Sequence, residues 1–197
     1  IQVLIMSLSP AASRQLIHTR TVTCNAYKRD DGLWDIEGHM TDIKTNPIPN
    51  EDRGGVIPAG EPLHEMWLRL TLDNQLKIHD AEASTEHAPF AICPSITPAY
   101  KRLKGLQIGP GWTKKVKELL GNTEGCTHHT ELLGPMATTA FQALYEELKN
   151  QEEQSEKPPI ILNTCHALAD TSPVARRLWP EHYKASSQDK SSENISA

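Results

Sequence analysis

The chain has 197 residues, of which 38% are hydrophobic, and it carries a formal net charge of −5 with a pI near 6.0. This length suffices for one domain with a buried core and appendages, but it is short for two full domains. The acidic balance argues against phosphate backbones and anionic lipid, so we predict neither nucleic acid nor a membrane as a partner.

We expect neither a membrane span nor a disulfide bond in this chain. The longest apolar runs, at residues 3–6 and 88–93, fall far short of the roughly 20 residues that cross a bilayer, and IQVLIM at the start has no charged signal-peptide region. The four cysteines are widely spaced and contain no CxxC pair: Cys24, Cys93, Cys126 and Cys165. We therefore expect reduced thiols and a cytoplasmic location.

Two strands are predicted first. Residues 16–27 are rich in Thr, Ile, Val and Tyr, and residues 29–32 supply a tight turn. Residues 33–41 then alternate, with Trp34, Ile36 and Met40 on one face and polar side chains on the other. Residues 45–62, rich in proline and glycine, are expected to form an irregular loop.

A hairpin and its covering helices follow. Residues 64–73 alternate with His64, Met66 and Leu68 inward, and a turn at Asp73 leads into another strand. Helices are expected near residues 98–104, at residues 112–120 and after Cys126, where apolar residues recur every three or four positions. Proline at position 135 is expected to split the last helix or delay its start.

These segments predict an α+β fold, an antiparallel sheet of about four strands covered on one face by C-terminal helices. We expect an N-terminal extension at residues 1–15, a single α+β domain over residues 16–183 and a disordered tail at residues 184–197, which has almost nothing apolar to bury.

Four stretches carry a family resemblance: HTRTVTCNAYKRDDGLWDIEGHMTD, AGEPLHEMWLRLTLD, GCTHHTELL followed by ATTAFQ, and NTCHAL. Together they resemble a bacterial family known as domain of unknown function twenty-eight eighty-nine, over most of residues 16–182. The resemblance implies membership of that family and no particular reaction or cofactor. His129 stands where the resemblance leads us to expect an aliphatic residue.

The polar face of the second strand is the first candidate site. Asp35, Glu37 and His39 could join Glu65 and Arg69 of a neighbouring strand to bring carboxylates and an imidazole together for acid–base chemistry. The alternative, which we favour, is a solvated outer sheet face with cross-strand ion pairs.

His64 is the second candidate, because strand parity places it beside Met66 and Leu68 at a strand start. Burial there would shift its pKa into a useful range. A structural histidine with a hydrogen-bond partner is the competing interpretation.

The third candidate is the start of the last helix, with Thr127 as the expected N-cap. Cys126, His128 and Glu131 lie together there, at the helix end that favours anions. The same groups are transition-metal ligands, and a metal set could be completed by Cys93, Cys165 or His166, although the spacings match no standard zinc pattern. Inert packing of the cysteines is the competing interpretation.

We expect His64, Glu65, His128 and Glu131 to be the catalytic groups of a pocket for a small organic molecule, with the imidazoles of His64 and His128 within about 10 Å of each other. The predicted chemistry is a lyase or isomerase step by histidine–carboxylate acid–base catalysis, without a cofactor. A non-catalytic binding or interaction module and a metal-dependent enzyme are the alternatives. A homo-oligomer is left open.

Overall fold

The computed structural model describes residues 8–152 and 158–185, and the side chains of residues 8–150 and 158–185. The chain forms two compact units, Ile1–Leu144 and Tyr145–Ala197, which are described separately. Residues 8–15 are exposed and contain no helix or strand, whereas the predicted tail lies outside the described residues from position 186 onward. A single domain over residues 16–183 stays a prediction.

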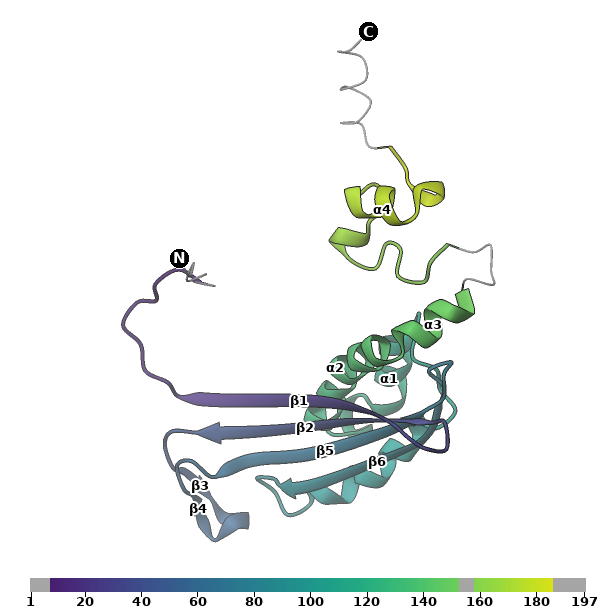
Figure 1. The fold of residues 1–197 in the computed structure, drawn as a ribbon. Coiled ribbons are helices and arrows are strands. Elements are labelled where there is room, and N and C mark those ends of the chain that lie inside the picture. The colour runs from purple at the N-terminus through teal and green to yellow at the C-terminus, as the bar shows by residue number, and fades with distance from the viewer. Residues whose placement is uncertain (1–7, 153–157, 186–197) are drawn as a thin grey trace. The chain divides into compact units, whose positions relative to one another are not determined.

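The first unit is built on a four-stranded antiparallel sheet with the strand order β1-β2-β5-β6 (Figure 1). Its strands are β1 (His18–Lys28), β2 (Trp34–Lys44), β5 (Pro62–Leu72) and β6 (Ile78–His87). Helices cover one face of this sheet, and the α+β class predicted from the sequence is confirmed.

Alternation of side chains decides which residues face the helices. In β2 the buried side chains are Trp34, Ile36, Met40 and Asp42, with Gly38 between them, because successive side chains point to opposite faces of a strand. The central strand β5 buries its own alternating set: Met66, Leu68, Leu70 and Leu72. By the same parity, His64 lies on the helix-covered face.

The prediction of an irregular loop over residues 45–62 is wrong for its middle. There β3 (Ile48–Asn50) and β4 (Gly55–Ile57) pair antiparallel around a 3₁₀ turn at Glu51–Arg53. The Asn50 side chain accepts a hydrogen bond from the Arg53 N–H, and Gly54 takes φ +79°, a conformation that favours glycine. Such local turn chemistry offsets the four prolines of the segment.

Two helical segments and α2 cover the inner face. The 3₁₀ segment η2 (Cys93–Leu103) packs against β6, α1 (Trp112–Leu120) lies against η2, and α2 (Thr127–Ala143) packs across β1, β2 and β5. A short 3₁₀ turn, η3 (Asn122–Glu124), precedes α2. The predicted helix at residues 112–120 is confirmed to the residue.

The expected disruption of α2 at Pro135 is wrong, since the helix runs without interruption from Thr127 to Ala143. Pro135 lies on the exposed face of the helix, and the Thr139 hydroxyl donates to the Pro135 carbonyl. The helix breaks instead at Leu144, before α3.

The second unit contains α3 (Tyr145–Glu152), η4 (His166–Leu168), α4 (Pro173–Leu178) and η5 (Pro180–His182). Ser172 caps α4 by accepting from the Ala175 N–H, and the Lys184 N–H donates to the Asp170 carbonyl. Across both units, none of the described helices has the length and apolar character to cross a membrane.

Candidate metal centre

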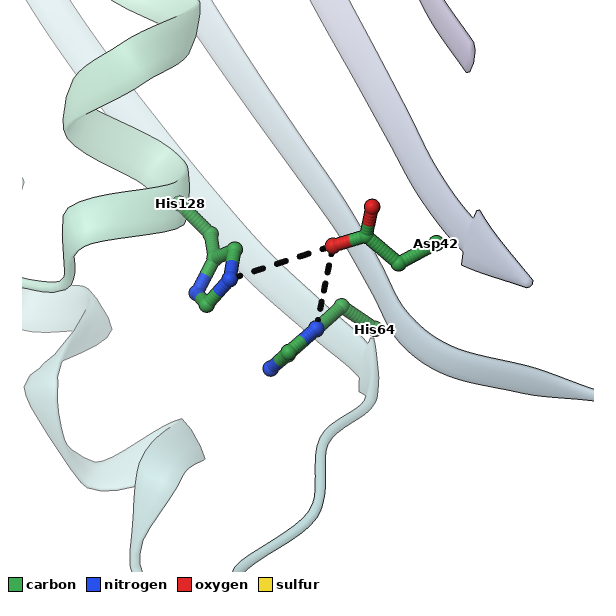
Figure 2. A group of neighbouring side chains, drawn as sticks. All are labelled: Asp42, His64 and His128. Carbon is green, nitrogen blue, oxygen red and sulfur yellow. Dashed lines mark hydrogen bonds and ion pairs between the residues drawn. The ribbon is translucent and has the colours of Figure 1, made fainter. Parts of the chain in front are cut away.

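Three side chains from three elements meet at the end of the sheet where α2 begins. Asp42 lies on the inner face of β2 and is 1% exposed. His64 lies directly opposite it on β5 in the antiparallel register, and His128 is the second residue of α2. We call Asp42, His64 and His128 the Asp42 centre; the sheet register places its first two members and the helix start adds the third (Figure 2).

Both imidazoles face the same carboxylate oxygen (Figure 2). The Nδ1 atom of His64 lies 3.1 Å from Oδ2 of Asp42, a hydrogen-bonding distance. The Nε2 atom of His128 lies 3.8 Å from this oxygen, too far for a hydrogen bond. One ligand atom from each residue lies within 4.8 Å of the others, and the two rings stack with centroids 3.7 Å apart.

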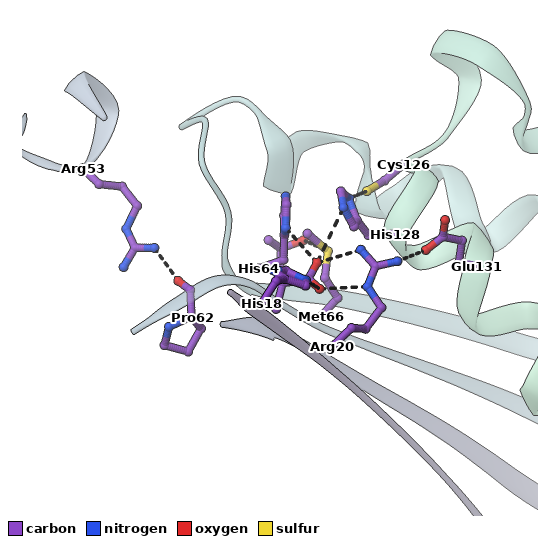
Figure 3. Close-up of polar contacts among 11 residues, drawn as sticks. His18, Arg20, Arg53, Pro62, His64, Met66, Cys126, His128 and Glu131 are labelled. Carbon is purple, nitrogen blue, oxygen red and sulfur yellow. Dashed lines mark hydrogen bonds and ion pairs between the residues drawn. The ribbon is translucent and has the colours of Figure 1, made fainter. Parts of the chain in front are cut away.

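Strand β1 supplies further donors to Asp42 (Figure 3). Arg20 binds the carboxylate in a bidentate manner, from Nε to Oδ1 and from Nη2 to Oδ2, both at 2.8 Å. His18 adds a contact from Nε2 to Oδ1 at 2.9 Å. The third nitrogen of Arg20, Nη1, bonds to Glu131 on α2. Asp42 is therefore a buried anion held by a cation and two imidazoles.

The electrostatics set the protonation of the centre. Burial by itself raises the pKa of the Asp42 carboxyl, but the hydrogen bond and charge of Arg20, with the bond from His18, lower this pKa to about 2. Burial lowers the pKa of His64, and the neighbouring His128 lowers it further. Burial and then the Arg20 charge lower the pKa of His128. At pH 7 the centre therefore holds an ionised carboxylate and two neutral imidazoles.

The predicted proximity of His64 and His128 is confirmed, because their rings are in contact. Glu131 lies at the edge of the centre, where it bonds to Arg20 and not to the imidazole of His64 or His128. Glu65 is on the other face of the sheet, where it bonds to His39 at 3.2 Å and to His87 at 2.8 Å. The structure thus brings two of the four predicted residues together; a catalytic role for any of them stays a prediction.

Asp42 is the residue that sequence reasoning missed. The signal was available, since position 42 continues the inward parity of Trp34, Ile36 and Met40, and a carboxylate on the apolar side of a strand needs partners. The strand was predicted only to residue 41, and its last inward position was therefore overlooked.

The outer sheet face carries the cross-strand ion pairs that we favoured for it. Arg69 pairs with Glu37 and with Glu82, and His39 contacts Glu65 while stacking on Trp67 with ring centroids 3.8 Å apart. These side chains form a partly exposed polar face and do not converge on one centre.

The start of α2 differs from the prediction in its cap. Cys126, and not Thr127, is the N-cap residue, and its side chain makes no capping hydrogen bond. Tyr100 of η2 instead binds the backbone of the N-cap residue, since its hydroxyl accepts from the Cys126 N–H at 3.1 Å. The Cys126 sulfur lies 3.9 Å from Nδ1 of His128, whereas the other ring nitrogen, Nε2, faces Asp42 (Figure 2). His129, the next residue, is buried and bonds to the Ser84 carbonyl.

The structure places none of the residues predicted to complete a metal-ligand set, Cys93, Cys165 and His166, in the described ligand cluster. Among the described residues, the group of potential metal ligands consists of Asp42, His64 and His128, and Cys93 is not part of it. Cys165 and His166 belong to the second unit, and their participation stays a prediction. All four cysteines are free thiols.

The family model described as protein of unknown function, DUF2889, matches residues 18–142. The chain belongs to this family. Neither the curated proteins nor the solved structures contain a match to this chain. The DUF2889 match begins at the first residue of β1 and ends within α2, so the whole Asp42 centre, Arg20 and Glu131 lie inside the family domain. The second unit lies outside the match.

Proposed function

We propose that this DUF2889 domain binds one divalent transition-metal ion through Asp42, His64 and His128 and uses it to act on a small organic molecule. The observation that carries the proposal is the convergence of two imidazole nitrogens on one buried carboxylate oxygen, at 3.1 and 3.8 Å. Hydrogen bonding accounts for the first of these contacts and not for the second.

The spacing of the three atoms suits an ion between them. Zn²⁺ holds imidazole nitrogen and carboxylate oxygen at about 2.0 to 2.2 Å, which places neighbouring ligand atoms about 3 to 3.5 Å apart. Nδ1 of His64 and Oδ2 of Asp42, 3.1 Å apart, already have that spacing. Nε2 of His128, which lies 3.8 Å from Oδ2 and within 4.8 Å of the His64 ligand atom, would have to move closer to both.

The other hydrogen bonds of Asp42 are compatible with a bound ion. Each carboxylate oxygen offers about two acceptor positions. At Oδ1 these are used by Arg20 and His18, and at Oδ2 one is used by Arg20. A metal held by Nδ1 of His64 and Oδ2 of Asp42 would take the place of the proton between them, and the neutral His64 ring would then carry its proton on Nε2, while Arg20 keeps the carboxylate in place. Bonds of this kind orient metal ligands in known sites.

The protonation states support the same function. Metal ligands bind as carboxylate and neutral imidazole, so a site whose histidines are already neutral and whose aspartate is ionised loses little in deprotonation. Two imidazoles and one carboxylate suit Zn²⁺ and non-haem Fe²⁺, and three protein ligands leave open positions for water or substrate. A bound ion would activate a water molecule or polarise an oxygen of the substrate.

Metal titration of the purified full chain tests this function. After chelation, Zn²⁺ and Fe²⁺ (anaerobically) are added and binding is measured by calorimetry and elemental analysis. We expect one equivalent per chain and, at 100 times the Kd, a stabilisation of about 2.7 kcal/mol. His64→Gln and His128→Gln should each weaken binding at least about 100-fold, since even indirect supporting residues cost 10- to 100-fold.

His79→Gln is the matched control, because His79 also pairs with an aspartate, Asp73, but lies in the β5–β6 hairpin away from the centre. It should bind metal as the parent chain does. Equal binding by His64→Gln, His128→Gln and this control would refute the proposed site.

A metal-free enzyme is the second candidate, and the Asp42–His64 bond favours it. With Asp42 ionised, Nδ1 of His64 must donate, which leaves its Nε2 as a proton acceptor oriented for general base catalysis. This is the lyase or isomerase chemistry expected from the sequence. If no metal binds, stabilisation of the parent chain but not of His64→Gln by small carboxylic acids in a thermal screen would support it. The small-molecule ligand and the cytoplasmic location remain predictions in either case.

A further inference from the structure

Strand β1 presents a long, regular edge. It pairs with β2 over eleven consecutive residue pairs without a register shift, and the order β1-β2-β5-β6 leaves its other side without a strand among the described residues. Such an edge offers backbone N–H and C=O groups to another strand.

The opposite edge of the same sheet is protected. Residues 105–108 run along the start of β6, with the Ile78 N–H donating to the Leu106 carbonyl at 2.8 Å and the Gly105 N–H donating to the Ile78 carbonyl at 2.7 Å. Beyond this cover, β6 carries Asp80, Glu82 and Glu86, which are exposed acidic side chains that discourage pairing. Two register shifts also interrupt the β5–β6 ladder.

None of these protective features occurs in β1. It contains no proline, no acidic side chain and no register shift; of its charged side chains, Arg20 is engaged by Asp42 and Glu131, and Lys28 stands at its last position. Its exposed side chains include Val22 and Tyr27. An unprotected strand of this kind is a site of association in other sheets.

We infer that β1 pairs antiparallel with β1 of a second copy of this chain, so that two four-stranded sheets join into one of eight strands. Among the described strands β3 and β4 pair with each other, and the second unit contains none, so no other described strand is available as the partner. A strand that pairs with itself about a two-fold axis makes a closed dimer.

The register that pairs all eleven residues places Thr23 opposite Thr23 of the second copy. It sets Val22 opposite Cys24, Arg20 opposite Ala26 and His18 opposite Lys28, so that no arginine or lysine faces another arginine or lysine. It also keeps the even-numbered residues of both copies on one face, and both helix layers therefore lie on the same side of the joined sheet. The pairing would hold the strand that carries His18 and Arg20, the two β1 donors to Asp42.

Light scattering of the full chain after gel filtration tests the inference. We expect twice the chain mass of 21.9 kDa for the parent protein. Thr23→Lys places two lysines opposite each other on the axis and should give the monomer mass, with a melting temperature that confirms a folded chain. Ser84→Lys introduces the same charge on an exposed position of β6 and should remain a dimer.

Cross-linking checks the register directly. In a Cys24→Ser background, Thr23→Cys should form a covalent dimer on oxidation, because directly opposite residues of antiparallel strands have Cβ atoms about 4.5 to 5.5 Å apart. Ser84→Cys in the same background should not. A monomeric parent chain, or a dimer that survives Thr23→Lys and fails to cross-link at position 23, would overturn the inference. Neither result bears on metal binding.

Discussion

At the scale of single residues, the Asp42 centre depends on Arg20. A carboxylate that is 1% exposed loses its hydration, and its bonds to Arg20 and His18 offset that loss. Arg20 is itself partly exposed, so most of the energetic effect of removing it comes from the anion left behind in the interior. The same side chain joins β1 to β2 through Asp42 and to α2 through Glu131.

We predict that Arg20→Met lowers the free energy of unfolding at pH 7 by about 1 to 3 kcal/mol, because it leaves the buried Asp42 carboxylate short of two hydrogen bonds. Chemical denaturation measures the change. Arg29→Met serves as the control: Arg29 pairs with Asp31 in an exposed turn, and its removal should leave stability nearly unchanged. Equal effects of both substitutions would show that the Asp42 contact is not special.

At the scale of elements, the approach of α2 to the sheet depends on a residue without a side chain. A Cβ atom at Gly38 of β2 would lie 2.7 Å from the sulfur of Met136 and 3.0 Å from its Cγ. The absence of a side chain at Gly38 lets Met136 of α2 approach β2 closely, and this approach helps to set the position of the helix that carries His128.

Gly38→Ala should therefore destabilise the fold by about 1 to 3 kcal/mol, as overpacked cores do. Gly134→Ala, on the exposed face of α2 with nothing within 4 Å of the new methyl group, should instead stabilise it by about 0.5 to 1 kcal/mol through helix propensity. If α2 is packed as described, urea denaturation should show a lower free energy of unfolding for Gly38→Ala and a higher one for Gly134→Ala. If Gly134→Ala instead lowered stability, the new methyl group would have to meet a neighbouring group, contrary to the packing described.

The β5–β6 hairpin is held by Asp73. Its Oδ1 atom accepts from the Gln75 and Lys77 N–H groups at 2.8 and 3.0 Å, and its Oδ2 atom contacts His79 at 2.8 Å. Burial alone raises the pKa of this carboxyl, but these hydrogen bonds lower it below its usual value. A carboxyl whose pKa is lower in the folded state stabilises the fold above its unfolded pKa and loses that contribution as the pH falls toward the folded value.

Asp73→Ala should cost about 1 to 2 kcal/mol at pH 7, and the difference from the parent chain should shrink as the pH drops below about 4. Thermal melts over a pH series measure it. For comparison, Asp80→Ala removes only an exposed pair with Lys101 and should change stability by less than about 0.5 kcal/mol. A pH-independent effect of Asp73→Ala would assign its contribution to something other than the ionised form.

At the scale of the whole molecule, the candidate metal centre and the core of the family domain both lie in the first unit. Its buried side chains extend from Trp34 on β2 to Leu144 after α2, and the Asp42 centre lies within the same span. The DUF2889 match, at residues 18–142, lies within that unit.

We predict that residues 1–144 expressed alone fold and bind metal as the full chain does, because this unit is compact by itself and contains the whole four-stranded sheet with α1 and α2. Circular dichroism melts and metal titration of the two proteins provide the comparison. The full chain cut after Tyr183 should likewise keep its melting temperature, as expected for an apolar-poor tail. An unfolded 1–144 fragment would make the second unit part of the folding core.

Local patterns determined much of this protein from sequence alone. The alternation of apolar residues predicts β2 and β5, the turn at Asp73 predicts that β6 follows, and apolar residues spaced by three and four predict the buried stripe of α2. All three signals depend only on near neighbours. His64 and His128 were found in the same way, because each stands at the start of a recognisable element. The family domain was visible in the same stretches.

Tertiary structure alone decided which of these residues form a centre. The β2–β5 register sets Asp42 opposite His64, and the packing of α2 over Gly38 brings His128 beside them. In the sequence, His64 lies 22 residues after Asp42, and His128 lies 64 residues after His64. Strand parity places Glu65 on the far face for the same reason that it places His64 on the near one. Such juxtapositions depend on long-range packing, which no window of neighbouring residues encodes.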